Sequence, residues 1–486
     1  MSQALILALV LPPIAGGVAA LVARRAVRAA AVFNAVTMPV SLAAAVALAG
    51  QLASGAPAVE AWPIWRLDAL SAVFALLVSA VTTLAVWLGP GLDARASSPP
   101  GEVRTFRVFA NLFAATMLVA VSTSSLGLMW VAIEASTVAA ALLIPLRQTR
   151  ASIDASWKFL IIGSVGIALA FAGTVLAFVD YAAAGGSTES ALEWTTLLAA
   201  APGLHPEVMR LAFAFLLVGF GTKAGLVPMH TWLPDAHSEA PAPLSAMLSG
   251  VLLAVALYAL ARWKVIVDAT TGSGFTDTLL LIFGVATILV GSLSLIAQRQ
   301  YKRLLAYSSI EHTGLACFGL ALGPLGSLAA LLHLTGHALA KSTAFLVAGR
   351  VLARYQSPDM ASTSGVLTAM PSSGVQLGAS LLALMGLPPF SLFLSEVLLL
   401  RAGWMAGHEA LTVGVMVLLV IAFAAFVHHG QAMLLGRPPD DVTRGERGTL
   451  ATLALVLPLG ALIWLGLYLP SGLWTLLEQA ARVLHP

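Results

Sequence analysis

Apolar stretches of roughly 20 residues follow one another along almost the whole chain, separated by short polar connections. A helix of this length spans the hydrocarbon core of a bilayer, which is about 30 Å thick. The pattern therefore predicts an all-α polytopic membrane protein with about 14 transmembrane helices. The predicted spans are 4–23, 29–50, 68–90, 106–124, 126–146, 158–180, 208–227, 244–262, 277–296, 304–322, 325–349, 373–403, 409–429 and 449–478.

Prolines interrupt the seventh and the twelfth of these predicted helices. Because the two breaks lie five helices apart, and five is odd, two five-helix units in tandem would enter the membrane from opposite sides. Paired interrupted helices in inverted repeats mark the transport site of many transporters. The interrupted regions contain Pro228, His230, Pro234, Asp235 and His237 in the seventh helix, and Pro388 and Pro389 in the twelfth.

The connections leave no room for a soluble domain, and we expect one antiporter-like membrane domain over residues 1–486. Its predicted parts are helices 1–3 at about 4–90, repeat one at about 106–262, repeat two at about 277–429 and helix 14 at about 449–478. Composition agrees, since 59% of the residues are hydrophobic and only 10% are charged. A soluble protein of this size is thereby excluded.

Positive charge is distributed unevenly between the predicted loops. Most Lys and Arg residues fall in the odd-numbered loops, in runs such as "RRAVR", "RQTR" and "QRQYKR". Loops rich in Lys and Arg remain in the cytoplasm. The bias predicts that both termini are periplasmic, and it explains the basic runs without a nucleic-acid partner.

Ionisable residues inside apolar spans are costly and are therefore candidates for function. His333, His337 and Lys341 are spaced four residues apart, so they share one helix face. Histidines and a buried lysine whose charge depends on a neighbouring carboxylate suit proton relay. The candidates for proton translocation are Glu134, Lys223, Lys341 and Glu396, and the candidates for proton relay are His312, His333 and His337.

Each candidate also has a structural interpretation. Glu134 and Lys223 could form a static ion pair, and the histidines of the stripe could serve packing through hydrogen bonds. His312 could lie near the membrane interface. The cluster His230, Asp235, His237 and Glu239 has metal-ligating residue types, but it lacks an HExxH spacing, and no metal is expected.

Three segments resemble a known family. "GTKAGLVPMHTWLPDAHSEAPAPLSAMLSG", "KRLLAYSSIEHTG" and "HALAKSTAFLVAG" resemble the antiporter-like membrane subunits of complex I, Mrp-type antiporters and group 4 hydrogenases, closest to the F-type subunit of hydrogenase-4. The resemblance implies fourteen helices with inverted five-helix repeats, in a bacterial inner membrane. It also implies roles for Glu134 as the helix-5 carboxylate, Lys223 and Lys341 as the lysines of helices 7 and 11, and Glu396 as the terminal carrier.

The chain departs from this family at several positions. Relatives often place a histidine or lysine in helix 8, where this chain has Ser249 and Ala254, so water or other side chains must make the central link. Gln300 replaces a common acidic residue, and the chain stops at Pro486, so the long lateral helix of some relatives is expected to be absent.

These patterns predict a proton-translocating subunit without its own redox or hydrolytic site. No Rossmann fingerprint or P-loop is present, and the single Cys317 cannot form a thiolate cluster, so no cofactor is expected. Energy would come from an ion gradient or from partners, which are other membrane subunits of a multisubunit complex (antiporter-like and hydrogenase-like, complex I-like or Mrp-like), with membrane lipid around it. The alternatives are an Mrp-type cation/proton antiporter subunit and a non-conducting structural membrane subunit.

Overall fold

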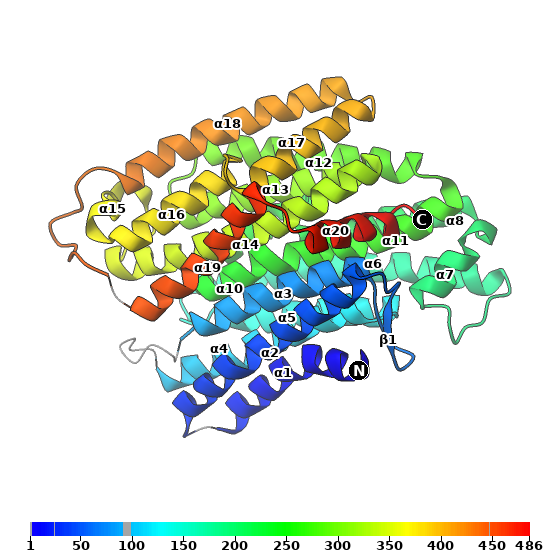
Figure 1. Cartoon of the computed structure of the whole chain (residues 1–486), viewed down its shortest axis with the longest axis horizontal. Coiled ribbons are helices and arrows are strands. Elements are labelled where there is room, and N and C mark those ends of the chain that lie inside the picture. The colour runs from blue at the N-terminus through cyan, green and yellow to red at the C-terminus, as the bar shows by residue number, and fades with distance from the viewer. Residues whose placement is uncertain (1, 24, 91–98, 447) are drawn as a thin grey trace.

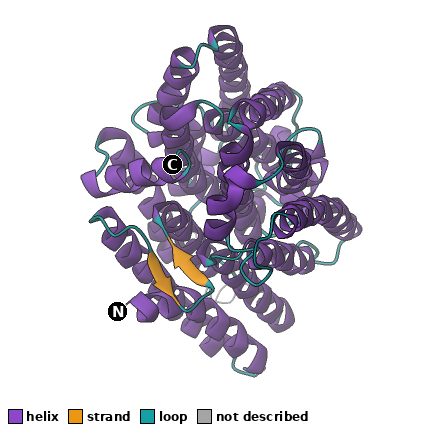
Figure 2. Ribbon diagram, turned by 90° about the vertical axis from the view of Figure 1, so that its right-hand side faces the viewer, coloured by secondary structure: helices purple, strands orange, loops and turns teal. Residues whose placement is uncertain are grey.

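The computed structural model describes residues 2–23, 25–90, 99–446 and 448–486. Its long helices lie side by side and run between the same two ends of the molecule (Figures 1 and 2). Within the described residues, the only strands are β1 (Val59–Ala61) and β2 (Trp65–Leu67), an antiparallel hairpin at one end. The predicted all-α class is confirmed, with this hairpin as a small addition.

The first long helices are continuous, and side chains cap three of them, α3, α5 and α6. Asp68 accepts a hydrogen bond of 2.9 Å from the Ser71 backbone N–H at the start of α3. Thr149 and Ser152 form a reciprocal capping box at the start of α6. These helices are α1 (Ser2–Val22), α2 (Val27–Ala53), α3 (Ala69–Trp87), α4 (Pro100–Ser122), α5 (Leu126–Leu143) and α6 (Arg150–Ala183).

The seventh predicted span is interrupted, but not by both prolines. Its first half ends at Gly225, whose φ of 75° is left-handed and stops the helix. Pro228 lies in the break, whereas Pro234 lies in the first turn of the second half, where its missing N–H removes no intrahelical bond. The prediction that Pro234 breaks the helix is wrong. The elements here are α7 (Trp194–Ala200), η1 (Ala201–Gly203), α8 (Pro206–Ala224), η2 (Met229–Thr231) and α9 (Trp232–Glu239).

The twelfth predicted span is also interrupted, at the predicted place. Its first half ends just before Gly386, which has a left-handed φ of 65°, and Pro388 and Pro389 fill the break. The second half then begins at Ser391. From the eighth span onward the elements are α10 (Ala242–Met247), the π-helical turn η3 (Leu248–Leu252), α11 (Leu253–Thr271), α12 (Gly274–Ile296), α13 (Tyr301–Leu320), α14 (Gly323–Tyr355), η4 (Met360–Ser362), α15 (Val366–Ala369), α16 (Pro371–Leu384), α17 (Ser391–Met405) and α18 (Glu409–Leu434).

The last predicted span is two helices rather than one. α19 (Thr449–Leu467) ends at the extended residue Tyr468, and α20 (Ser471–Val483) begins after Pro470. The residue before a proline is disfavoured in the α conformation, which explains the break inside the expected 449–478 span. α20 then packs against α2, α3 and α14.

Eleven segments of the described chain are long and apolar enough to cross a membrane by themselves. The three other predicted crossings correspond to α13, to α14 and to the pair α16 and α17. α13 and α14 carry the polar residues of the predicted relay, while α16 and α17 have only 14 and 15 residues. The criterion of length and hydropathy therefore misses the segments with the most polar or most broken sequence, and the count of fourteen stays a prediction.

A buried ion pair joins two of the central helices. Arg262 of α11 donates to both carboxylate oxygens of Asp68 before α3, at 2.7 and 2.5 Å, and both residues are buried. The guanidinium also lies 4.5 Å from the ring centroid of Trp194. Breaking such a pair leaves an uncompensated buried charge, so it fixes α3 against α11.

Candidate functional site

The lysine near the end of α8 lies beside the glutamate of α5. Lys223 Nζ is 3.5 Å from Glu134 Oε2 and also donates a hydrogen bond to Thr137 Oγ1. Ser164 Oγ of α6 donates to the other oxygen of Glu134 at 2.7 Å. Lys223 is fully buried, while 24% of the Glu134 side chain is exposed. The structure thus brings together the two residues that the sequence suggested as charge partners.

The space for this lysine comes from small and aromatic neighbours. A Cβ atom at Gly163 of α6 would lie 2.8 Å from Lys223 Nζ, so a larger residue there would displace the ammonium group from its present position. The ring of Phe159 lies 5.5 Å from Nζ on the same helix. Lys223 also occupies the last turn of α8, where the partial negative charge of the helix end favours a cation.

The second group of candidates meets between α13, α14 and α17. His312 Nδ1 lies 3.0 Å from His333 Nε2, and His333 Nδ1 lies 3.0 Å from Ser395 Oγ of α17. The ring of His337 is 5.2 Å from that of His312, centroid to centroid. His312 is buried and lies eleven residues beyond the first residue of α13, near the middle of that helix and away from its start.

Lys341 and Glu396 both lie beside this histidine group. Lys341 Nζ is buried and donates to the backbone oxygen of Leu305 at 2.6 Å. The Glu396 carboxylate packs directly against Gly386 in the break between α16 and α17, where a Cβ atom would overlap it. The residue that follows Ser395 is therefore held at the interruption, as the sequence predicted.

Sequence reasoning passed over Glu311, which belongs to the same group. It is buried in α13 and interacts electrostatically with both Lys341 and Glu396. Among the described residues, its Oε2 has no hydrogen-bond partner. The signal was present in "SSIEHTG", where an acid stands next to His312 inside a helix that is otherwise largely apolar.

The histidine group has the donor types of a metal site but not the spacing of a preformed one. One ligand atom each from His312, His333 and Glu396 lie within 4.8 Å of one another. In a tetrahedral zinc site such atoms lie about 3.4 Å apart, each about 2.0–2.1 Å from the metal. Because the two histidines already share a hydrogen bond of 3.0 Å, the arrangement fits a hydrogen-bonded chain better than a metal cage.

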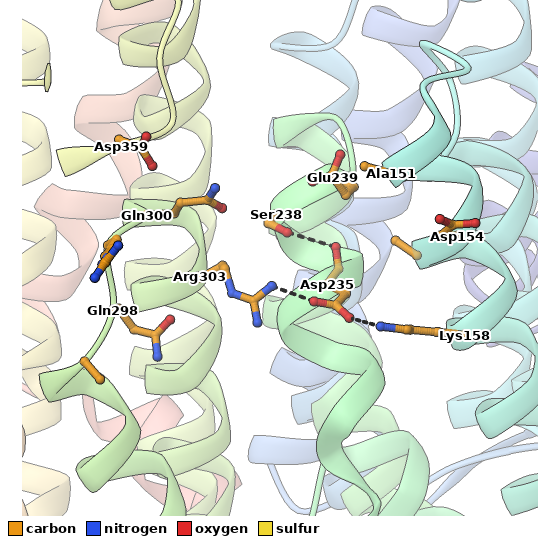
Figure 3. Close-up of a pocket in the computed structure, with 13 residues that line it drawn as sticks. Ala151, Asp154, Lys158, Asp235, Ser238, Glu239, Gln298, Gln300, Arg303 and Asp359 are labelled. Atoms are coloured by element: carbon orange, nitrogen blue, oxygen red, sulfur yellow. Dashed lines mark hydrogen bonds and ion pairs between the residues drawn. The ribbon is translucent and has the colours of Figure 1, made fainter. Parts of the chain in front are cut away.

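The polar residues around the first break point in different directions. The ring of His237 is buried and stacks on Phe345 at 5.0 Å, centroid to centroid, whereas His230 is only half-buried. Asp235 faces a cavity of about 690 Å³ between α6, α9 and the start of α13 (Figure 3). Within the described residues, these side chains and Glu239 form no common ligand group.

Asp235 joins two basic side chains across that cavity. Lys158 of α6 donates to Oδ2 at 2.7 Å, and Arg303 of α13 donates to Oδ1 at 2.5 Å (Figure 3). Lys302, the buried residue that precedes Arg303, donates to the backbone oxygens of Ser238 and Ala240 at 2.8 and 2.6 Å. A cation thus satisfies the C-terminal end of α9, as a helix dipole favours.

Comparison with known proteins assigns the chain to a family. Residues 123–422, more than half of the chain, match the family described as "NADH:quinone oxidoreductase/Mrp antiporter, TM". The chain belongs to this family. The predicted resemblance is confirmed, and the protein is an antiporter-like membrane subunit of the hydrogenase-4, complex I or Mrp type.

Two relatives in the family cover most of this chain. A hydrogenase-4 component F homolog of Methylacidiphilum infernorum is 36% identical over 77% of this chain and 80% of its own length. An NADH-quinone oxidoreductase subunit N of Desulforudis audaxviator is 32% identical over 85% of this chain and 82% of its own length. These names show that members of the family serve in multisubunit membrane complexes.

The fold of this antiporter-like protein also matches a solved structure. A chain of the Mrp complex from Dietzia sp. DQ12-45-1b has a TM-score of 0.87 at 23% identity, over 100% of this chain and 97% of its own. At this identity the likeness shows the fold alone. Membership of this membrane-subunit family, together with the eleven long apolar segments, supports insertion of the helices into a membrane.

Proposed function

We propose that this antiporter-like protein moves protons through its buried acids, lysines and histidines. The observation that carries the proposal is the pairing of Lys223 with Glu134 at 3.5 Å beside an interrupted helix. A second cluster, in which His312 and His333 share a hydrogen bond, lies beside the other interrupted helix. Ionisable groups at broken helices are typical of transport sites.

The chemistry at the first cluster follows from the distance between the two charges. When the Glu134 carboxylate is close, the ammonium form of Lys223 is stabilised. When the carboxylate moves away or is neutralised, the buried ammonium loses that compensation and releases a proton. Lys223 thereby becomes a proton store that is loaded and unloaded by the position of Glu134.

In the second cluster the proton passes between neutral histidines. An imidazole that receives a proton at one ring nitrogen can release the proton on the other, so His312 and His333 can pass a proton along their shared hydrogen bond and each returns to the neutral form. Lys341 supplies or receives it at one side, and His337 lies next to His312. Glu396 is the terminal carrier at the break between α16 and α17.

We further propose a bacterial inner membrane location with both termini periplasmic, one domain over residues 1–486, and inverted five-helix repeats. Other membrane subunits of a multisubunit redox or ion-transport complex are the partners, and they supply the energy. Hydrogenase-4 component F is the favoured type, because the Methylacidiphilum homolog covers 77% of the chain at 36% identity.

Replacing the charge pair tests the function. We expect Lys223→Ala and Glu134→Gln each to abolish most proton movement by the assembled complex in vesicles, and the double variant to be no worse. Arg210→Ala is the matched control, because Arg210 is a cation on the same helix in an exposed pair with Glu207. Proton uptake is measured per assembled complex.

The alternatives give different results in the same assay. A static ion pair predicts unstable single variants whose folded fraction still transports protons. Near-normal proton movement in Lys223→Ala would reject the proposal. Proton flux that requires added Na⁺ or K⁺ would favour the Mrp-type cation/proton antiport instead.

A further inference from the structure

The two proton clusters are separated by a segment without an ionisable side chain. The π-helical turn η3 (Leu248–Leu252) packs against α14, the helix of Lys341, and the residue that follows it, Leu253, faces the end of α8, the helix of Lys223. On one side, a Cβ at Gly225, two residues after Lys223, would lie 3.8 Å from the Leu253 side chain. On the other, a Cβ at Gly250 would lie 3.3 Å from the backbone oxygen of Ala338 in α14.

Two buried serines connect this turn to the second cluster. Ser249 Oγ in η3 lies 2.7 Å from Ser309 Oγ of α13, and neither side chain is exposed. Ser309 Oγ in turn lies 3.0 Å from the backbone oxygen of Leu305. That oxygen also accepts the hydrogen bond of 2.6 Å from Lys341 Nζ. The distance between Lys341 Nζ and Ser309 Oγ is therefore no greater than the sum of these two distances.

The direction of the hydrogen bonds follows from the number of protons available. Each hydroxyl has one proton. If Ser309 donates to Leu305, then Ser249 donates to Ser309, and the lone pairs of Ser249 Oγ remain free to accept. When Lys341 is neutral, Ser309 can turn its proton toward the amine instead. The pair thus forms a two-step path: Ser249 can accept a proton at one end, and Ser309 can donate one at the other.

We propose that Ser249 and Ser309 are the central proton link of the relay, in place of an ionisable residue in helix 8. A hydronium ion that reaches Ser249 gives a proton to its Oγ, and Ser249 passes its own proton to Ser309 Oγ. Ser309 gives its proton to neutral Lys341 Nζ, which becomes an ammonium group. One O–H bond forms and one breaks at each serine, so both hydroxyls are regenerated.

The local structure supports this assignment in two further ways. The N–H of Leu253 bonds to the backbone oxygen of Leu248, five residues back, and such π turns occur frequently at functional sites. Neutral hydroxyls also avoid the cost of a charge inside the membrane while remaining able to exchange protons. The inference rests on the proposed function, because it supplies protons to the same Lys341.

Serine variants test the link without removing a carrier. We expect Ser249→Ala and Ser309→Ala each to slow proton movement about tenfold or more, because a proton-transfer partner is lost. The double variant should be no slower than either single one, since the serines act in series. Ser309→Thr keeps the hydroxyl and should restore most of the rate. Ser309→Ala should stay slow even in complexes that assemble normally, which a purely structural role of the Ser–Ser bond does not predict.

Ser308→Ala is the matched control on the same helix. Ser308 is buried next to Ser309, but its Oγ has no hydrogen-bond partner among the described residues, so its loss should leave transport unchanged. Normal transport in both Ser249→Ala and Ser309→Ala, beside loss of transport in Lys341→Ala, would overturn the serine link and leave the relay intact. Normal transport in Lys341→Ala as well would contradict the proposed function itself.

Discussion

At the scale of single residues, Glu396 shows how local geometry holds a carrier. Its carboxylate fills the space next to Gly386. Two features favour glycine at position 386: its φ of 65° is left-handed, and a Cβ atom there would overlap the Glu396 carboxylate. Ser395, the preceding residue, bonds His333 at 3.0 Å. One turn of α17 therefore touches both the break and the histidine chain.

The first prediction concerns this acid. We expect Glu396→Gln to assemble normally, because the amide has the shape of the carboxyl group, but to conduct protons poorly, because it cannot release one. Proton movement in reconstituted vesicles, per assembled complex, measures this. Glu409→Gln, in the first turn of α18, is a control acid outside the histidine group. Unchanged transport in Glu396→Gln would place the terminal carrier elsewhere.

At the scale of elements, three helices are built from two pieces, and charged or polar groups meet the free ends. Lys223 lies in the last turn of α8, and Lys302 bonds the final carbonyls of α9. Cations at these C-terminal ends match the helix dipole. The third broken pair, α19 and α20, ends differently, because a histidine just after α20 fixes it to α14.

That contact makes the docking of α20 depend on pH. His485, outside the helices, lies 2.9 Å from Ser327 Oγ through Nε2. Burial lowers the pKa of His485, and Lys264 lowers it further, while Asp277 and Asp268 oppose the shift. A histidine with a lowered pKa stabilises the docked state above its unperturbed pKa of about 6.5, and this contribution is lost as the pH falls below that value.

We therefore expect hydrogen exchange in α20 to become faster as the pH is lowered from about 7.5 to 5.5, after correction for the intrinsic pH effect on exchange. His485→Gln should remove this dependence, because glutamine can still bond Ser327 but does not titrate. His408→Gln, in the loop before α18, is the control and should keep it. The same pH dependence in His485→Gln would assign it to another group.

At the scale of the whole molecule, the helices form one bundle in which each predicted five-helix unit has a broken fourth crossing. These crossings are α8 with α9, and α16 with α17. Both termini lie at the same end of the bundle (Figure 1), as an even number of crossings requires. The loops that join α12 to α13 and α5 to α6 carry basic runs.

The positive-inside rule assigns these basic loops to the cytoplasm, so we expect both termini in the periplasm. Reporter fusions after Pro486 test this: a reporter active only in the periplasm should work there, and a cytoplasm-only reporter should not. A fusion in the loop between α12 and α13 should show the reverse pattern. Cytoplasmic activity at Pro486 would overturn the orientation and, with it, the direction of both repeats.

The sequence by itself determined the fold class and most of the charged site. Apolar runs reveal membrane helices because their length must match the bilayer, and an ionisable residue within such a run is conspicuous. Glu134, Lys223, Lys341 and Glu396 could be picked out in this way. The positions of the breaks were less certain, because Pro234 and Pro470 look alike in the sequence while only the second ends a helix.

Only the tertiary structure decided which residues meet. Ser249 and Ser309 are 60 residues apart in the sequence. A neutral hydroxyl adds no charge and changes the hydropathy of a helix little, so the pair cannot be recognised from either property. Whether two such groups face one another depends on the rotation of their helices, here shifted by the π turn before α11. The same reason applies to Asp235, which the sequence places in a cluster with His230, His237 and Glu239. Helix packing turns it toward a cavity with Lys158 and Arg303, because polar partners on other helices compensate its charge there.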